Sequence, residues 1–278
     1  MQSIRMIGAT IVGAMVAWPR KSTLRSAVLL IFAVRPCLGQ QAANANTADI
    51  RVPLVGCKSG GQAGPVEAPT QNDKTVQVDR RLAQKLAYYK PASGSGVLAP
   101  RGWFCFGTYG SGGDTTFVTP EPIDSRRLFS EEWQSLTGPA VEVDYRFGGT
   151  SGRSSVARVI ARVFPKYKTF VDGVVELFDS LAQEMVFGPY PADRLVYRSD
   201  RVVEYRTPAH SEGLGTAISR LKPNDQPIEG VATLLGEMPE IDLLLLTTRL
   251  PPELTSLKAP IIQELEREAA GEPPNRAR

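Results

Sequence analysis

The residues of this chain best suited to catalysis are its only histidine, His210, and two serines in glycine-rich segments, Ser111 and Ser151. Histidine is the usual general base because it titrates near neutral pH, and a serine beside it can act as a nucleophile. Neither serine completes a Gly-x-Ser-x-Gly nucleophile elbow, since Tyr109 and Arg153 each occupy a position where that motif requires glycine. A hydrolase that uses His210 with one of these serines is therefore an alternative hypothesis.

The cysteines provide another candidate nucleophile together with a competing structural interpretation. The chain has three cysteines, and Cys37 lies in the predicted export signal described below. The remaining pair, Cys57 and Cys105, predicts one disulfide, because two thiols in an oxidising compartment are usually joined. Closing a loop of this length stabilises a fold by at most about 4 kcal/mol in the chain-entropy view. The catalytic alternative is a free Cys105 thiol served by His210.

A glycine-rich segment between a predicted strand and a predicted helix has the composition of an anion site. Loop amides and a helix N-terminus expose unpaired N–H groups, and an arginine adds positive charge. The segment matches neither the P-loop nor the Gly-x-Gly-x-x-Gly pattern. Its hydroxyl side chains could instead cap the helix, with the glycines forming a tight turn. The candidate residues are Gly149, Thr150, Ser151, Gly152 and Arg153.

Carboxylates at helical spacing raise the possibility of a metal site. Asp172, Glu176 and Asp179 share one side of a predicted helix, where their oxygens could hold a hard cation. A solvated helix face has the same spacing, and this is the interpretation we adopt. A single histidine and paired cysteines leave no cluster with zinc-ligand spacing. We expect no metal and no cofactor.

The amino-terminal residues have the order of a bacterial-type export signal. Basic residues between positions 20 and 25 precede an apolar run over residues 27–34, and small residues follow. We assign residues 1–39 to the signal, with cleavage after Ala45 as an alternative and Met15 as an alternative start. The apolar runs are shorter than the roughly 20 residues that span a bilayer, so we expect no stable membrane span after cleavage.

Removing the signal changes the charge of the chain. The segment carries five basic residues and no acidic one, so its loss changes the formal net charge from +3 to −2. Nucleic-acid binding needs clustered basic side chains on the folded domain. The basic character of the precursor therefore does not support a nucleic-acid partner.

Turn residues and hydrophobic periodicity divide the first part of the mature chain into elements. Asp79 is a suitable N-cap, and Gly102–Tyr109 with Thr115–Val118 has the composition of a β-hairpin. The expected elements are a polar, mobile lead over 40–49, an edge strand over 51–55, a glycine-rich loop over 56–70, a helix from Asp79 through Leu82, Leu86 and Tyr89, and the hairpin over 102–118.

The second part begins with an alternating segment, Val141–Phe147, which predicts a half-buried strand. Two helices follow, over 154–163 and after Pro165. The apolar residues expected on one buried face of the second helix are Phe170, Val174, Leu177, Phe178 and Leu181. The remaining expected elements are strands over 195–198, 202–207, 229–235 and 241–249 and a helix over 253–268.

Groups of strands between groups of helices predict an α+β fold with an antiparallel or mixed sheet, several packed helices and one disulfide. We expect a single domain over residues 50–270, in which residues 50–125 could form a disulfide-linked subdomain, and a polar tail over 271–278.

Two segments carry a resemblance to a known family. Residues 97–110, Val-Leu-Ala-Pro-Arg-Gly-Trp-Phe-Cys-Phe-Gly-Thr-Tyr-Gly, and 187–193, Phe-Gly-Pro-Tyr-Pro-Ala-Asp, are similar to those of a family of uncharacterised secreted bacterial proteins. The resemblance implies an exported location and brings no activity, substrate or cofactor with it.

These observations favour a periplasmic or secreted protein that binds an unknown envelope polymer or protein without catalysis. The binding surface would include the glycine-rich hairpin around Ser111 and the neighbouring loops. The alternative hydrolase requires His210 within hydrogen-bond reach of a serine or cysteine nucleophile.

Overall fold

The first strand, β1 (Thr47–Gly61), organises the amino-terminal part of the fold. In the computed structural model, which describes residues 47–124 and 135–271, successive parts of β1 pair with three other strands. Its beginning pairs antiparallel with β2 (Asp73–Asp79), its middle parallel with β3 (Leu86–Pro91) and its end parallel with β5 (Phe104–Gly110). The described residues all belong to one compact unit, Asn44–Arg278. The predicted signal lies outside the described residues.

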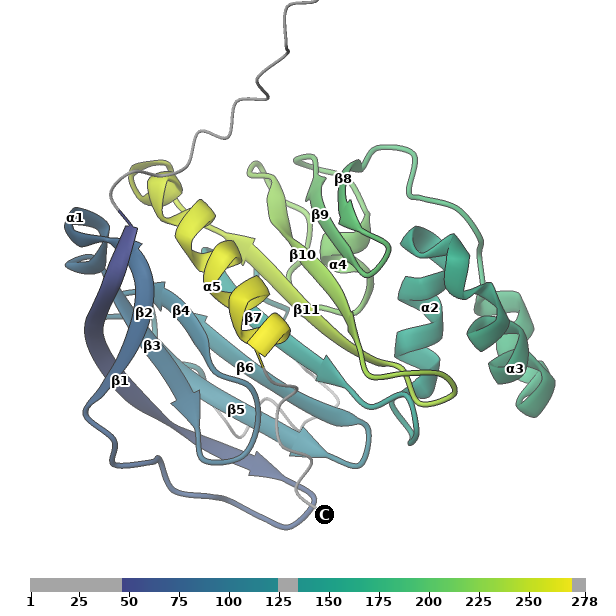
Figure 1. The fold of residues 1–278 in the computed structure, drawn as a ribbon, viewed down its shortest axis with the longest axis horizontal. Coiled ribbons are helices and arrows are strands. Elements are labelled where there is room, and N and C mark those ends of the chain that lie inside the picture. Colours follow the sequence, from purple (N-terminus) through teal and green to yellow (C-terminus); the bar gives the residue numbers. More distant parts are fainter. Residues whose placement is uncertain (1–46, 125–134, 272–278) are drawn as a thin grey trace, which may run out of the picture. The chain divides into compact units, whose positions relative to one another are not determined.

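Within the described residues, eleven strands form one mixed sheet (Figure 1), which is richer in strand than the α+β prediction implies. The strand order is β4-β3-β1-β5-β6-β7-β11-β10-β9-β8, with β2 joined to β1. Apart from the two parallel pairings of β1, these neighbours are antiparallel. The remaining strands are β4 (Val97–Pro100), β6 (Gly113–Thr119), β7 (Ala140–Arg146), β8 (Arg194–Ser199), β9 (Val202–Thr207), β10 (Ile228–Leu235) and β11 (Asp242–Arg249).

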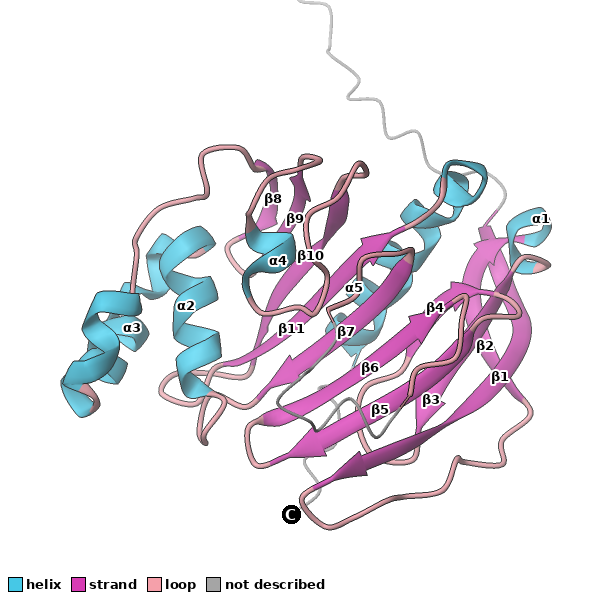
Figure 2. Cartoon of the chain, turned by 180° about the vertical axis from the view of Figure 1, so that it is seen from behind, coloured by secondary structure: helices cyan, strands magenta, loops and turns pink. Residues whose placement is uncertain are grey.

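Helices connect and cover the strands. The α-helices are α1 (Arg80–Ala83), α2 (Arg153–Val163), α3 (Lys168–Leu177), α4 (Leu214–Ala217) and α5 (Lys258–Gly271). Short 3-10 helices lie between α2 and α3 (Pro165–Tyr167), after α3 (Asp179–Glu184) and before α5 (Pro252–Leu257). α5 lies across one face of the sheet (Figure 1), whereas α2 and α4 are seen on the other face in Figure 2. The two faces therefore have separate hydrophobic cores.

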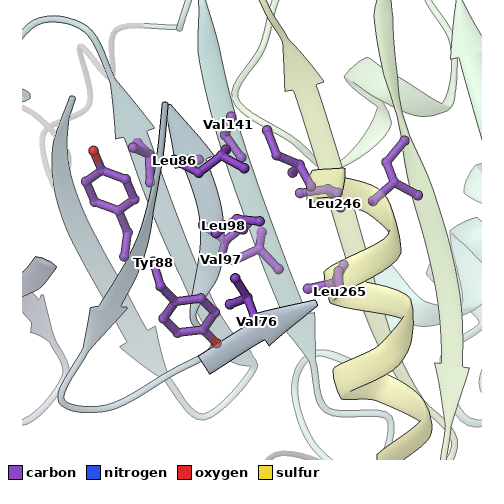
Figure 3. Packing of buried hydrophobic residues seen from close by; sticks show 14 of the residues in the cluster. Val76, Leu86, Tyr88, Val97, Leu98, Val141, Leu246 and Leu265 are labelled. Atoms are coloured by element: carbon purple, nitrogen blue, oxygen red, sulfur yellow. The ribbon is translucent and has the colours of Figure 1, made fainter. Parts of the chain in front are cut away.

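The alternation of side chains along the central strands produces these two cores. On β11, Leu244 and Leu246 belong to the core beneath α5, and Leu243 and Leu245 belong to the core beneath α2. Figure 3 shows Leu246 beside Leu265 of α5, with side chains of β2, β3, β4 and β7 completing the group. Because both faces of the sheet are covered, the sequence of β11 contains a continuous apolar run instead of alternating apolar and polar residues.

The disulfide that the sequence predicts is present. Cys57 of β1 and Cys105 of β5 are bonded, with their Cα atoms 5.3 Å apart. The two strands are parallel neighbours, and the bond lies at the point where β1 begins to pair with β5. The amino-terminal strand is thereby joined covalently to the hairpin formed by β5 and β6.

Two expectations for this region are wrong. The glycine-rich loop was expected from Gly56, but Gly56–Gly61 continue β1, and β1 begins at Thr47, within the expected mobile lead. The helix expected from Asp79 to Tyr89 is only the short α1, after which the chain forms β3. Asp79 does cap α1, since its carboxylate accepts from the N–H of Arg81 at 2.7 Å. β3 is buried and bonded on both edges, so pairing with β1 and β4 overrides the helical spacing.

The expected buried face of α3 is also only partly correct. Phe170 and Val174 are buried, but the side chains of Leu177 and Phe178 are among the large hydrophobic residues left exposed. The principal partner of α3 is α2, and α3 ends at Leu177, before the apolar spacing does. Phe178 follows the end of the helix, so the helical spacing no longer sets its position, and Leu177 is exposed as the last helical residue.

Candidate functional site

Two glycine-rich segments that the sequence marks separately are in contact in the folded chain. Ser111, in the turn between β5 and β6, and Ser151, between β7 and α2, have their hydroxyl oxygens 2.9 Å apart. The side chain of Gln62, after β1, donates to the Ser111 hydroxyl at 3.3 Å and accepts from the Ser111 N–H at 2.9 Å. The Thr150 hydroxyl donates to the carbonyl of Ser111. We call Gln62, Ser111, Thr150 and Ser151 the loop cluster.

Glycines allow the two loops of the cluster to approach so closely. A Cβ atom at Gly152 would lie 2.0 Å from the carbonyl oxygen of Gly112, so no side chain fits there. Gly113 has a φ of 136° and packs against the backbone of Tyr145, which again requires glycine. A backbone hydrogen bond from Phe147 to Gly112, 3.2 Å long, joins the loops further. The cluster is therefore held by backbone packing as well as by side-chain hydrogen bonds.

The predicted anion site overlaps this cluster at Thr150 and Ser151. Gly152 is the N-cap of α2 and makes no side-chain capping hydrogen bond, so the interpretation that Thr150 or Ser151 caps the helix is wrong. Arg153 turns back onto its own loop, and its Nε donates to the carbonyl of Gly148 at 3.1 Å. Its N–H donates to the carbonyl of Thr150, also at 3.1 Å. The segment around Gly149 is thus a compact turn in which Arg153 donates hydrogen bonds to two of the backbone carbonyls.

His210 lies elsewhere on the chain, in the loop that joins β9 to α4. Its side chain is 70% exposed, and its Nε2 is 3.3 Å from a carboxylate oxygen of Asp225. Ser111 and Ser151 hydrogen-bond to one another and to Gln62 instead. Cys105 is in the disulfide. Among the described residues, the geometry therefore does not bring His210 into hydrogen-bond contact with any of the three proposed nucleophiles.

The carboxylates considered for a metal are also dispersed. Asp172, Glu176 and Asp179 are exposed, and Asp172 forms an ion pair with Lys168, four residues before it on the same helix. In the described part of the chain, no group of three or more histidine, cysteine, aspartate or glutamate residues is placed to hold a metal ion. None of the described helices is long and apolar enough to cross a membrane.

Sequence reasoning missed a pair of buried acids on β7. Val141–Phe147 was expected to present its polar side chains to water, but Glu142 and Asp144 are 1% and 0% exposed. The strands β6 and β11 pair with β7 on its two edges and so flank both acids. The N–H of Arg220, in the segment after α4, donates to both carboxylate oxygens of Glu142 at 3.0 Å. The segment that covers the pair is distant in sequence, so the alternating pattern could not reveal it.

The electrostatics of the two acids differ. Asp144 accepts from the Thr115 hydroxyl at 2.7 Å and forms an ion pair with Arg146. Burial, followed by the negative charge of Asp144, raises the pKa of Glu142 well above its usual range. A protonated Glu142 can donate to Oδ2 of Asp144, for which the described residues provide no other donor. Burial and the charge of Asp144 therefore favour the protonated form of Glu142, and both acids lie inside the sheet.

A buried arginine holds the neighbouring loops. Arg249, at the end of β11, is 0% exposed, and its guanidinium donates to carbonyl oxygens instead of a carboxylate. The acceptors are the carbonyls of Leu136, Thr137 and Gly138, at 3.3, 3.0 and 3.1 Å, and that of Lys222. This one side chain joins the segment before β7 to the segment before β10.

Comparison with known proteins adds no identification. No protein-family model matches the chain, and neither a curated protein nor a solved structure does. The function must therefore be argued from the geometry of the chain itself.

Proposed function

We propose that the mature chain is an exported, non-catalytic binding protein that holds an envelope polymer or a partner protein at the loop cluster. The observation that carries this proposal is the 2.9 Å contact between the hydroxyls of Ser111 and Ser151. It joins two exposed segments from different connections of the sheet into one polar surface. Such a surface loses little conformational entropy on binding, because its side chains are already ordered.

The chemistry of the loop cluster fits recognition by hydrogen bonds. Gln62, Ser111, Thr150 and Ser151 are exposed and uncharged, and they supply hydroxyl and amide groups. Small side chains and glycines leave the backbone of both loops accessible to a ligand. A polymer with many hydroxyl or amide groups, or an extended protein segment, offers matching donors and acceptors.

Co-sedimentation with an insoluble envelope fraction tests this proposal. We expect the mature wild-type chain to sediment with the fraction and a Ser111→Ala/Ser151→Ala variant to sediment at least threefold less. Ser199→Ala is the matched control, because it removes an exposed hydroxyl from the β8–β9 turn, where Ser199 accepts from the N–H of Arg201 at 3.1 Å. Equal sedimentation of the double variant and the wild type, both folded, would overturn the proposal.

The same assay separates the two kinds of partner. Digestion of the envelope fraction with a protease before mixing removes a partner protein but leaves a polysaccharide. Binding that survives digestion identifies a polymer, and binding that is lost identifies a protein. A chain that sediments with neither preparation contradicts the proposed function.

Export is a separate part of the proposal and has its own test. It rests on the order of basic, apolar and small residues over 1–39 and on the pairing of Cys57 with Cys105. After expression of the full chain in a bacterial host, we expect a periplasmic or medium fraction to contain a protein that begins at Gln40 or at Asn46. An intact amino terminus in the cytoplasmic fraction alone would contradict this expectation.

A further inference from the structure

A small cavity lies beside the carboxyl-terminal strands, away from the loop cluster. It has a volume of about 240 Å³ and is bounded by residues of β9, β10 and β11, the 3-10 helix Pro252–Leu257 and the first residue of α5. Sites for drug-sized ligands measure roughly 300–1,000 Å³. A ligand of this cavity would therefore be small, with few non-hydrogen atoms.

Three charged side chains line the cavity in a defined arrangement. One oxygen of Glu229, Oε1, accepts from a terminal nitrogen of Arg206 and from Nζ of Lys258, both at 2.9 Å. Glu229 is the most buried of the three, with 16% of its side chain exposed, against 33% for Lys258 and 49% for Arg206. The carboxylate thus lies deepest, and the two cations lie nearer to the opening.

Each of the three groups keeps unused hydrogen-bonding capacity. Arginine has five N–H donors and lysine has three, of which Arg206 and Lys258 each use one on Glu229. The second oxygen of Glu229, Oε2, accepts no hydrogen bond from the described side chains around the cavity. A ligand with a carboxylate would satisfy the cations, and an ammonium would satisfy Oε2.

The other walls fit a ligand with a short side chain. Leu250 and Pro252 give apolar surface, and Gln226 and Thr255 supply polar groups at the side. A cluster formed only to pair charges on a surface would need no hollow between the strands and the helix. Here the paired charges line one.

We infer that this cavity binds a free α-amino acid as its zwitterion. The ligand carboxylate binds Arg206 and Lys258, the ammonium binds Oε2 of Glu229, and a methyl-sized side chain lies against Leu250. This site is independent of the loop cluster and of any polymer bound there.

Three related probes test the inference on the mature chain. Alanine carries both charged groups, propionate lacks the ammonium, and ethylamine lacks the carboxylate. We expect two-dimensional NMR titration to show alanine binding at least tenfold more tightly than either of the others. Equal affinities for alanine and propionate, or no shift at millimolar alanine, would overturn the inference.

Variants assign the two halves of the ligand to their residues. Glu229→Gln should lower the affinity for alanine to that for propionate and leave the affinity for propionate unchanged. Lys258→Gln should lower the affinity for both. Arg198→Gln is the matched control, since Arg198 Nε is 2.6 Å from Glu204 Oε1 in an ion pair outside the cavity. If Glu229→Gln does not fold, Lys258→Gln, at a more exposed position, carries the test. Alanine affinity reduced equally by Lys258→Gln and Arg198→Gln would contradict the proposed site.

Discussion

The loop cluster and the polar groups on β7 and β11 use the same kinds of hydrogen bond in opposite environments. Ser111 and Ser151 are exposed and uncharged, and each has water available as a substitute partner. Glu142 and Arg249 are almost completely buried, so each depends on the protein for every partner. The cost of an unmade hydrogen bond is small in water and large in an interior.

The comparison separates the groups that maintain the fold from those that are available for binding. Arg249 and Glu142 hold backbone groups from segments far apart in sequence, Leu136–Gly138 and Arg220. The loop cluster also joins segments far apart in sequence, but its side chains are exposed to water. We therefore expect substitutions in the first set to change stability and substitutions in the second to change binding.

Arg249→Met gives the largest expected effect. Methionine fills a similar volume but removes the buried guanidinium that donates to the carbonyls of Leu136, Thr137, Gly138 and Lys222, and breaking a hydrogen-bond network around a buried side chain is costly. We expect the free energy of unfolding, measured with urea, to fall by about 4 kcal/mol. Arg198→Met, at an exposed arginine, should change it by less than about 0.5 kcal/mol. Similar decreases in the free energy of unfolding of the two variants would show that the buried guanidinium does not stabilise the fold.

Asp114 offers a smaller effect that depends on pH. This β6 residue is 7% exposed, and its Oδ1 accepts from the N–H of Ser95 at 2.7 Å. Burial raises the pKa of its carboxyl from 3.8 to about 6. One pKa unit corresponds to about 1.4 kcal/mol, so the charged form destabilises the fold by about 3 kcal/mol above pH 6.

Asp114→Asn removes this titration. Because the folded pKa lies above the unfolded one, the contribution of Asp114 is most favourable below pH 3.8 and is lost as the pH rises through about 6. The asparagine variant should be up to about 3 kcal/mol more stable than the wild type at pH 7.5 and equally stable at pH 3.5. Urea unfolding at the two pH values measures this. An asparagine variant that is less stable than the wild type at pH 7.5 would contradict a raised pKa for Asp114.

Glu142→Gln should flatten the pH dependence further. The raised pKa of Glu142 means that wild-type stability falls as the pH rises above 4.5, by up to about 1.4 kcal/mol per pH unit for this proton. The glutamine side chain can donate to Oδ2 of Asp144 at every pH, as the protonated carboxyl of Glu142 can only below its pKa. Glu67→Gln, at a side chain that is 83% exposed, serves as the control and should leave the slope unchanged. A glutamine variant with the wild-type slope would show that another group binds the proton.

Local patterns in the sequence predicted the elements whose structure is decided locally. The β5–β6 hairpin, β7, α2 and the carboxyl-terminal strands follow from turn residues and periodicity within a few positions. The strand nature of Gly56–Gly61 and of Leu86–Pro91 was missed, because pairing with distant strands decides it. Glycine and helical spacing are weak preferences beside a complete set of ladder hydrogen bonds.

The candidate site was predicted in parts rather than as a whole. Ser111 and Ser151 each stood out because glycines surround them, but their contact depends on β6 and β7 being neighbours. The burial of Glu142 depends on the segment at Arg220, and the hydrophobic periodicity of β7 carries no information about that segment. Sequence patterns thus indicated where loops would be, and the order of strands in the sheet decided which loops would meet.

The smallest expected effect on stability is also the sharpest test of the comparison. Ser111→Ala removes the hydroxyl that contacts Ser151 and Gln62 but keeps the N–H that donates to Gln62. Since water can replace the lost partner at an exposed position, the free energy of unfolding should fall by less than about 1 kcal/mol. Sedimentation with the envelope fraction should nevertheless decrease. A variant that loses as much stability as Arg249→Met would place the loop cluster among the groups that maintain the fold, and unchanged sedimentation would separate Ser111 from binding.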